Sequence, residues 1–278
     1  MTNKPKFQDD FSAAEQAELN RLLLEGLALI TPELGQQDVL KTQVLARITQ
    51  SLAKQAGVLT VRLKDGVWRT LTSGIRYKPL WSGSAGNSVL IELAPGAALP
   101  QHRHNWLEEG MVLRGDLHMG DLQLGPLDYH MSPLGSRHGR IHSDNGALAF
   151  LRGTSLGHKP GVLTELLGGL IPGKGDACLT VFDQDNHAWL AITDGVFIKE
   201  LCSDAQQLSR MVRLQAGATW TGGSHQHDTE YMLLAGEVFL NDVLLQAGDY
   251  QLAAAGSCHA DIYTDVGATL FIRGDPDF

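Results

Sequence analysis

The chain has 278 residues, of which 43% are hydrophobic, so it can bury a sizeable core and exceeds the size of one small domain. Its formal net charge of -9, without a cluster of Lys and Arg, excludes a nucleic-acid-binding surface. Three separated cysteines without a CxxC exclude a disulfide framework and a thiolate zinc site, and the chain lacks an apolar run of about 18 residues. We therefore expect a soluble cytoplasmic protein that binds neither nucleic acid nor membrane.

Two helices are expected at the start of the chain. Ser12 and Glu15 form a capping box before an apolar stripe over residues 19–30. A second apolar stripe has helical spacing and is closed by Gly57. Its members are Leu40, Val44, Ile48 and Leu52. Apolar stripes of this size are usually shielded from water. We therefore expect residues 1–57 to pack on the rest of the protein or on another subunit, in a homo-oligomer.

From residue 58 the hydrophobic period changes from helical to about two. The segments VLTVRL, NSVLIEL, EGMVLRGDLHM and GALAFLRG are short and rich in Val, Leu and Ile. Gly, Pro, Asp and Asn separate them. This pattern is typical of an all-β sandwich or barrel.

The β-rich part of the chain contains an internal repeat. WRTLTSGIRYKPL, which begins at Trp68, recurs as WLAITDGVFIKEL at Trp189, an offset of 121 residues. Further matches follow at the same offset. They pair Gly96 with Gly217, Gly115 with Gly236, Gly135 with Gly256, and His138 with His259. So many matches at one offset predict two copies of one β domain.

The repeat defines the expected domain boundaries. A helical segment over residues 1–57 precedes the first β domain, 58–155. A linker rich in Gly and Pro, 156–178, joins it to the second β domain, 179–278.

The stretch LPQHRHNWLEEGMVLRG carries the clearest chemistry. On a strand, His102 and His104 share one face because alternate side chains point the same way. A tight return brings Glu108 back on the neighbouring strand, and SPLGSRH supplies His138. Three nitrogen donors and one oxygen donor suit Zn, Mn, Fe, Ni or Cu and leave coordination positions open for water or a ligand.

These segments match the two sequence motifs of the cupin superfamily. The residues of the first motif are Gly96, His102, His104, Glu108 and Gly115, and those of the second are Pro133, Gly135 and His138. Leu127 stands where the second motif normally begins with glycine, while the later copy has Gly248.

The chain further resembles the cupin-like domain of ChrR-type anti-sigma factors. The likeness rests on the lead-in Trp68, Gly74 and Lys78 and on the segments APGAALPQHRH, VLRG and GSRH. It implies a mainly β protein of two tandem cupin domains, each a jelly-roll β-barrel, after a short N-terminal helical segment. It also implies a divalent transition metal, Zn, Fe, Mn or Ni, inside the first barrel. The implied ligands are His102, His104, Glu108 and His138.

Other polar residues near these motifs receive a plainer interpretation. Glu108 has the motif's spacing to His104 and Gly115, so it is the expected ligand. Glu109 is expected to be a neighbour of the ligands. The isolated histidines are interpreted as ordinary polar residues. They are His118, His130, His142, His158 and His187.

The second copy departs from the first motif. In GGSHQHDTEYMLLAG the histidine pair has moved two residues along, so His225 aligns with His104 and His227 with Trp106. A slip of two keeps both imidazoles on the same strand face. A second metal site is therefore expected, and a degenerate pocket is the alternative. The expected ligands are His225, His227, Glu230 and His259.

Two functions follow from the resemblance. ChrR-type proteins bind a sigma factor through an N-terminal helical domain and respond to oxidative signals through a cupin, which implies a regulator that senses small molecules or oxidants. The N-terminal zinc signature of that family, a His followed by CxxC, is absent, since the first cysteine is Cys178. The alternative is a mononuclear metal-dependent dioxygenase or related cupin enzyme that acts on a small oxygenated substrate.

Overall fold

The structure is a computed structural model that describes residues 17–18, 21, 34–169, 178–184, 189–204, 206–258 and 261–276. The chain divides into two compact units, residues 1–51 and 52–278. The helix expected over 19–30 lies outside the described residues, apart from residue 21, which is helical.

The second expected helix is present as α2, Leu34–Lys54. It begins after Pro32 and is followed by Gly57, whose φ of +77° suits the left-handed turn that closes many helices. No helix in the described part of the chain is long and apolar enough to cross a bilayer.

The first barrel is formed by strands β2 to β13 together with β14. One sheet has the strand order β14-β10-β7-β13-β4-β3-β2, a second has the order β5-β12-β8-β9, and β6 pairs with β11. The strand bounds are β2 Arg69–Thr72, β3 Ile75–Gly83, β4 Gly86–Leu93, β5 Ala98–Leu99, β6 His102–Arg103, β7 Glu108–Gly115, β8 Leu117–Met119, β9 Leu122–Leu124, β10 Tyr129–Ser132, β11 Arg137–His138, β12 Ile141–His142, β13 Ala147–Thr154 and β14 Leu179–Val181.

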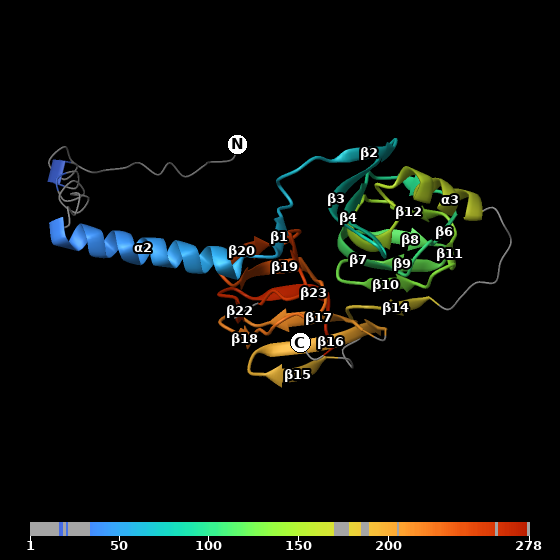
Figure 1. The fold of residues 1–278 in the computed structure, drawn as a ribbon. Helices are drawn as coiled ribbons and strands as arrows, with labels where there is room; N and C mark the ends of the chain where they lie inside the picture. The colour runs from blue at the N-terminus through green and yellow to red at the C-terminus, as the bar shows by residue number, and fades with distance from the viewer. Residues whose placement is uncertain are drawn as a thin grey trace, which may run out of the picture. The chain divides into compact units, whose positions relative to one another are not determined.

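The second barrel repeats this arrangement with the later strands. Its main sheet has the order β1-β21-β19-β23-β17-β16-β15, while β18, β20 and β22 close the other side. The strand bounds are β1 Val58–Val61, β15 Leu190–Thr193, β16 Val196–Ser203, β17 Leu208–Leu214, β18 Thr219–Thr221, β19 Thr229–Leu240, β20 Val243–Gln246, β21 Tyr250–Ala253, β22 Asp261–Tyr263 and β23 Ala268–Gly274. The predicted tandem arrangement of two cupin barrels is confirmed (Figure 1).

The final glycine of each first motif allows two strands to approach closely. Gly115 has φ +81°, and a Cβ there would lie 1.8 Å from the carbonyl oxygen of Gly146. Gly236 has φ +78°, and its Cβ would lie 2.0 Å from the oxygen of Gly267. Any side chain at these positions would separate the strands, so both copies need glycine there.

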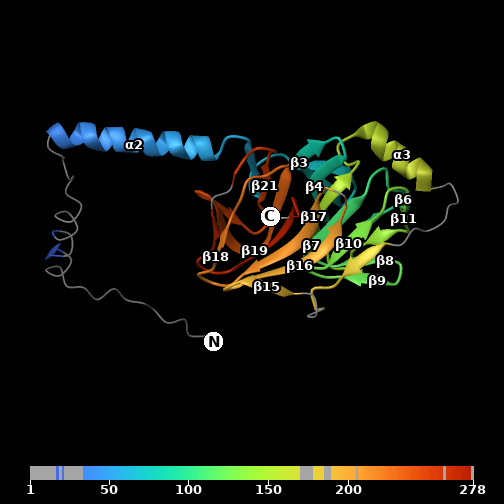
Figure 2. The same ribbon diagram turned by 60° about the horizontal axis from the view of Figure 1, so that its bottom comes forward.

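The two copies exchange strands. β1, which precedes the first barrel, pairs with β21 of the second, with Val58 opposite Ala253. β14, which precedes the second barrel, pairs with β10 of the first, with Tyr129 opposite Val181 (Figures 1 and 2). Each strand covers a sheet edge of the other copy, which satisfies backbone groups that an open edge would leave unpaired.

The barrels share one apolar core. Tyr129 and Phe150 of the first barrel face Tyr250 and Phe271 of the second, and these two pairs are related by the 121-residue offset. The ring centroids lie 6.5 Å apart for Tyr129 and Phe271 and 6.1 Å apart for Phe150 and Tyr250. The contact is therefore nearly symmetric, like that of an isologous dimer.

A buried ionic network crosses the same interface. Arg152 donates from Nε to Glu230 at 2.7 Å and from Nη1 to Glu109 at 3.2 Å. Tyr129 donates to Glu109 at 2.8 Å, and Tyr250 donates to Glu230 at 2.9 Å. The network supplies each carboxylate with charged and neutral donors, as burial of a charge requires.

Part of the expected linker is a helix. α3, Lys159–Gly169, lies in the segment 156–178 and packs on β6. Its last glycines permit this contact, since a Cβ at Gly169 would lie 2.7 Å from the carbonyl oxygen of Gln101. The segment expected to be a linker therefore contains a helix, from which Val162 and Leu166 line the interior of the first barrel.

Candidate metal centre

The four ligands expected in the first copy come from short strands and the turns beside them. His102 on β6 lies directly opposite His138 on β11. His104 follows β6 and is fixed by its backbone, which donates to Ser136 O at 2.9 Å and accepts from Gly135 N at 2.9 Å. Thus the first motif is held against the turn of the second.

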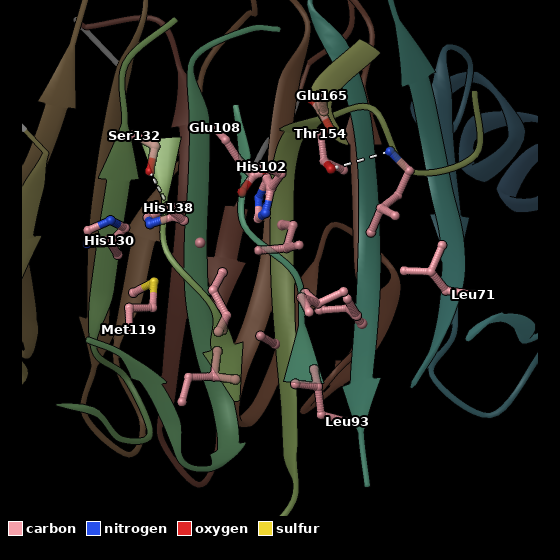
Figure 3. A pocket seen from close by; sticks show the side chains of 18 of the residues that line it. Leu71, Leu93, His102, Glu108, Met119, His130, Ser132, His138, Thr154 and Glu165 are labelled. Atoms are coloured by element: carbon pink, nitrogen blue, oxygen red, sulfur yellow. Dashed lines mark hydrogen bonds between the residues drawn. The ribbon is translucent and has the colours of Figure 1, made fainter. Parts of the chain in front are cut away.

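The four side chains converge on one region. Imidazole centroids lie 5.0 Å apart for His102 and His104, 4.8 Å for His104 and His138, and 5.8 Å for His102 and His138. One donor atom each of His102, His104 and Glu108 lies within 4.8 Å of the others. Figure 3 shows Glu108 beside His102, with His138 across from them.

Burial keeps the imidazoles of His104 and His138 neutral, which is the form that binds metals. Burial, and then the proximity of His102, lowers the pKa of His104 to about 3. The same causes, burial first and then the other histidines, lower the pKa of His138 to about 2. Burial raises the pKa of Glu108.

The surroundings of these side chains fit a metal ion. His104 is only 2% exposed, and neither of its ring nitrogens has a hydrogen-bond partner in the described residues. An unpaired buried polar atom costs about 1–3 kcal/mol, so a ligand for these nitrogens is expected. The two neighbouring imidazoles are each oriented by a hydrogen-bonding contact at one ring nitrogen. His102 Nδ1 lies 3.0 Å from Pro100 O, and His138 Nε2 lies 2.7 Å from Ser132 Oγ.

A cavity of about 450 Å³ opens beside the candidate ligands. His102, Glu108 and His138 line it, together with polar residues that the motifs did not indicate (Figure 3). These additional residues are Thr72, His130, Ser132, Thr154 and Glu165. Most of the remaining lining is aliphatic.

His130 was interpreted as an ordinary polar residue, but it lines this cavity. Its Nδ1 lies 2.9 Å from Thr180 Oγ1 on the exchanged strand β14, while its Nε2 has no partner in the described residues. Burial lowers its pKa to about 4. Its spacing of two from Ser132 on a strand places both on one face, a signal that could have been recognised.

Glu165 comes from α3 and was missed because its segment was expected to be a linker. It is 7% exposed, and burial raises its pKa to about 7. The Asn105 backbone N–H donates to its Oε1 at 3.4 Å. It is therefore a buried acid that can exchange a proton near neutral pH at the edge of the cavity.

The described members of the ligand set expected in the second copy each have other partners. His225 occupies the same backbone position as His104, donating to Ser257 O at 3.0 Å and accepting from Gly256 N at 2.8 Å. Its Nδ1 lies 3.0 Å from Thr229 Oγ1, which stands at the position of Glu108. Its other nitrogen lies 3.4 Å from the hydroxyl oxygen of Tyr231.

Two further expected ligands of the second site have other partners. His227 is 40% exposed in its side chain and pairs with Asp275 at 2.7 Å. Glu230 aligns with Glu109, not with Glu108, and belongs to the interface network with Arg152. Glu230 thus contacts the interface network and His227 contacts Asp275, while His259 lies outside the described residues, so the second metal site stays a prediction.

The family comparison agrees with this architecture. The model of the ChrR cupin-like domain matches residues 56–156 and again residues 179–276. The chain belongs to the ChrR cupin-like family. The two matches follow the two copies of the repeat.

Individual relatives of this ChrR-like bicupin are distant. It is 31% identical over 83 residues to the anti-sigma-E factor ChrR of Cereibacter sphaeroides. That match covers 27% of this chain and 39% of the relative's length.

Solved structures with the same fold are also known. A candidate dioxygenase from Nostoc punctiforme has a TM-score of 0.58 and 16% identity, over 80% of this chain and 83% of that one. Bacillus subtilis oxalate decarboxylase OxdC has a TM-score of 0.56 and 15% identity, over 79% and 78% of the two chains. At this identity the likeness shows a shared fold only.

Proposed function

We propose that this ChrR-like bicupin is a regulatory protein whose first barrel binds a divalent transition metal and responds to small molecules or oxidants. The observation that carries the proposal is the buried His104, with both ring nitrogens unpartnered in the described residues and other donors around it. A structural histidine would have its nitrogens satisfied by neighbouring groups.

The ligands would be His102, His104, Glu108 and His138, and the metal Zn, Fe, Mn or Ni. Three imidazoles and one carboxylate match the preferences of these ions. One neighbour of the same fold, the oxalate decarboxylase of Bacillus subtilis, is described by its Mn(II) centres, which supports a metal of this class. A bound ion would supply a Lewis acid and a coordination position for an incoming ligand.

The chain's own residues prepare the site for such a ligand. Pro100 O and Ser132 Oγ orient two of the imidazoles, so that less reorganisation is needed on binding. The aliphatic cavity wall excludes water, and Glu165 holds a proton beside it. These features suit reversible binding of a small molecule.

The partner of the regulator is a separate part of the proposal. The name of the Cereibacter relative indicates a sigma factor, yet this chain lacks the N-terminal His and CxxC of that family. The apolar stripe of α2 is suited to bind another protein chain. We infer that a second copy of this protein is that chain, in a cytoplasmic homo-oligomer, with a sigma factor as the alternative.

The metal content of the purified protein tests the central proposal. Protein prepared without chelators should contain at least one transition metal ion per chain by elemental analysis, and His102→Ala and Glu108→Gln should lower that value. Gln184→Ala, on the surface of the second half, serves as the control. Metal content near zero, with no gain after refolding with Zn, Mn or Fe, would contradict the proposal.

An enzyme is the second candidate function. The cavity beside the ligand set favours it, because a substrate there would reach the metal and the Glu165 carboxyl together. Dioxygen consumption by the metal-loaded protein with small diketones and carboxylic acids would support it. Co-purification of a sigma factor, without such consumption, would support regulation.

A further inference from the structure

The cavity of the first barrel has a polar end and a longer apolar end. Apart from Thr72, which follows Leu71 in sequence, the polar side chains gather around His102 and His138 (Figure 3). Leu71 and Leu93 lie on the side away from His130 and His138 in the same view. The remaining aliphatic lining includes Ile91, Leu99, Val112, Leu117, Leu124 and Leu151.

Among the residues that the structure describes, no Lys or Arg lines this cavity. Arg103, between the two histidines in sequence, points away and donates from Nε to Gly135 O at 3.0 Å on the exposed side. The charged residues among the cavity lining are acidic, Glu108 and Glu165. A second carboxylate or a phosphate at the apolar end would therefore lose its hydration without gaining a cation.

We propose that the first barrel binds an amphipathic small molecule with an apolar body and a single oxygen-donor head group, such as a medium-chain monocarboxylate. This inference rests on the proposed function, because the head group lies at the metal ligands. The body lies among the aliphatic side chains, as in most small-molecule sites of this size. Dianions with a carboxylate at each end of an apolar body, such as decanedioate, are disfavoured by the same lining.

The second barrel shows which residues open the cavity. Tyr231 is fully buried at the position of Gly110, and its hydroxyl approaches His225. Leu270 is fully buried at the position of Ala149. Both Gly110 and Ala149 line the cavity of the first barrel. The small residues are therefore what leaves room for a ligand body.

Helix α3 completes the enclosure. Val162, Glu165 and Leu166 all line the cavity from this helix. Asn105 ties the start of the helix to the barrel by donating from Nδ2 to Gly161 O at 3.0 Å. The same side of the barrel thus provides apolar contact for the body and a proton donor near the head group.

Calorimetric titration of the metal-loaded protein tests the inference. Decanoate is the probe, with decanedioate as the matched dianion. We expect decanoate to bind at least about tenfold more tightly than decanedioate, because only decanedioate places a second, unpaired charge at the apolar end. Equal or tighter binding of decanedioate would overturn the proposal.

Gly110→Tyr should abolish decanoate binding by introducing the side chain of the second barrel. A Cβ at Gly110 would lie 3.2 Å from Leu151 Cδ2, so a small shift of that flexible side chain is needed. Ala149→Leu, a milder filling, should weaken binding if Gly110→Tyr does not fold. Unchanged decanoate affinity in a folded variant of either kind would contradict the cavity assignment.

A change of specificity is a stricter test. Leu71→Lys places a cation at the apolar end. The ratio of the affinity for decanedioate to the affinity for decanoate should therefore rise by at least about tenfold. Ile192→Lys, at the equivalent position of the second barrel, should leave the ratio unchanged. A ratio that does not move in Leu71→Lys would overturn the proposed orientation.

Metal dependence separates this inference from the proposed function. Decanoate should bind at least about tenfold more weakly to His104→Ala than to the loaded parent. If the unsubstituted protein takes up no metal and Gly110→Tyr still blocks decanoate binding, the proposed metal site is wrong. The proposal that the apolar cavity binds the ligand body then stands. If the parent takes up metal and decanoate does not bind, the ligand class proposed here is wrong.

Discussion

The first and second barrels have the same motif backbone and different interiors. Three positions account for much of the difference. They have His102, Glu108 and Gly110 in the first barrel and Gly223, Thr229 and Tyr231 in the second. In the first barrel this leaves a cavity and a buried imidazole whose nitrogens have no hydrogen-bond partner among the described residues, whereas in the second a Thr and a Tyr approach the equivalent imidazole.

The residues at the interface between the barrels differ much less. Tyr129 and Glu109 in the first barrel have Tyr250 and Glu230 as counterparts, with the same hydroxyl-to-carboxylate hydrogen bond. The comparison teaches that a duplicated domain can keep its contact surface while the interior of one copy holds a cavity and the interior of the other is filled by packed side chains. Buried donors and packed side chains compete for the same interior volume.

The largest expected effect is on metal binding, and it distinguishes His104 from His225, which occupy equivalent backbone positions in the two barrels. His104→Ala should weaken metal binding by at least about tenfold, because a ligand of the complete set is lost. His225→Ala should remove less metal. Elemental analysis of both variants after identical dialysis provides the measurement. If His225→Ala empties the protein and His104→Ala stays loaded, the second barrel is the functional centre.

The interface network should be asymmetric despite its near symmetry. Arg152 contacts both Glu109 and Glu230, while Arg273 contacts Glu109 at 3.4 Å and also Asp204. Arg152→Met should therefore lower the free energy of unfolding by about 3–5 kcal/mol, the cost of stranding a buried charge. Arg273→Met should lower the free energy of unfolding by less than Arg152→Met does. Urea denaturation of both variants makes the comparison, and equal losses would contradict the assigned asymmetry.

The buried acid of α3 gives the first barrel a pH dependence. Its pKa is raised from 4.5 to about 7, so the folded state favours the protonated form and stability falls as pH rises between these values. Glu165→Gln should leave the free energy of unfolding of metal-free protein unchanged near pH 4.5 and raise it by about 1–3 kcal/mol above pH 7. The exposed Glu200→Gln is the control. A pH-independent difference would refute the assignment.

The smallest expected effect concerns a stacked pair on both barrels. His118 and His142 stack at 4.8 Å, and Phe239 and Tyr263 stack at 4.6 Å at the equivalent positions. The double variant His118→Phe, His142→Tyr should change the free energy of unfolding by no more than about 1 kcal/mol and leave the metal content unchanged. A loss of metal would instead show that these imidazoles hold an ion, with the nearby Asp144.

Much of the architecture was predictable because it repeats in the sequence. The offset of 121 residues and the change of hydrophobic period indicated two β-barrels, and the motif spacing brought His102, His104 and Glu108 together. These are local properties, since strand alternation and a tight turn act over a few residues.

The missed features depend on contacts distant in sequence. Strand exchange joins residues such as Val58 and Ala253, and no local pattern specifies which edge a strand covers. Glu165 acquires its role because α3 packs on β6, although its segment is rich in the Gly and Pro typical of linkers. The register of Glu230 was available from the repeat, where its match is Glu109.

The strand exchange has a consequence for synthesis on the ribosome. β1 emerges early but its partner β21 lies about 190 residues later, so β1 must wait while the whole first barrel and most of the second are translated. The first barrel, in turn, lacks its edge strand until Leu179–Val181 has left the exit tunnel. Folding of the two copies is thereby tied to the completion of the chain, and a nascent chain stalled between them exposes the unpaired edge of β10 and the unpaired strand β1.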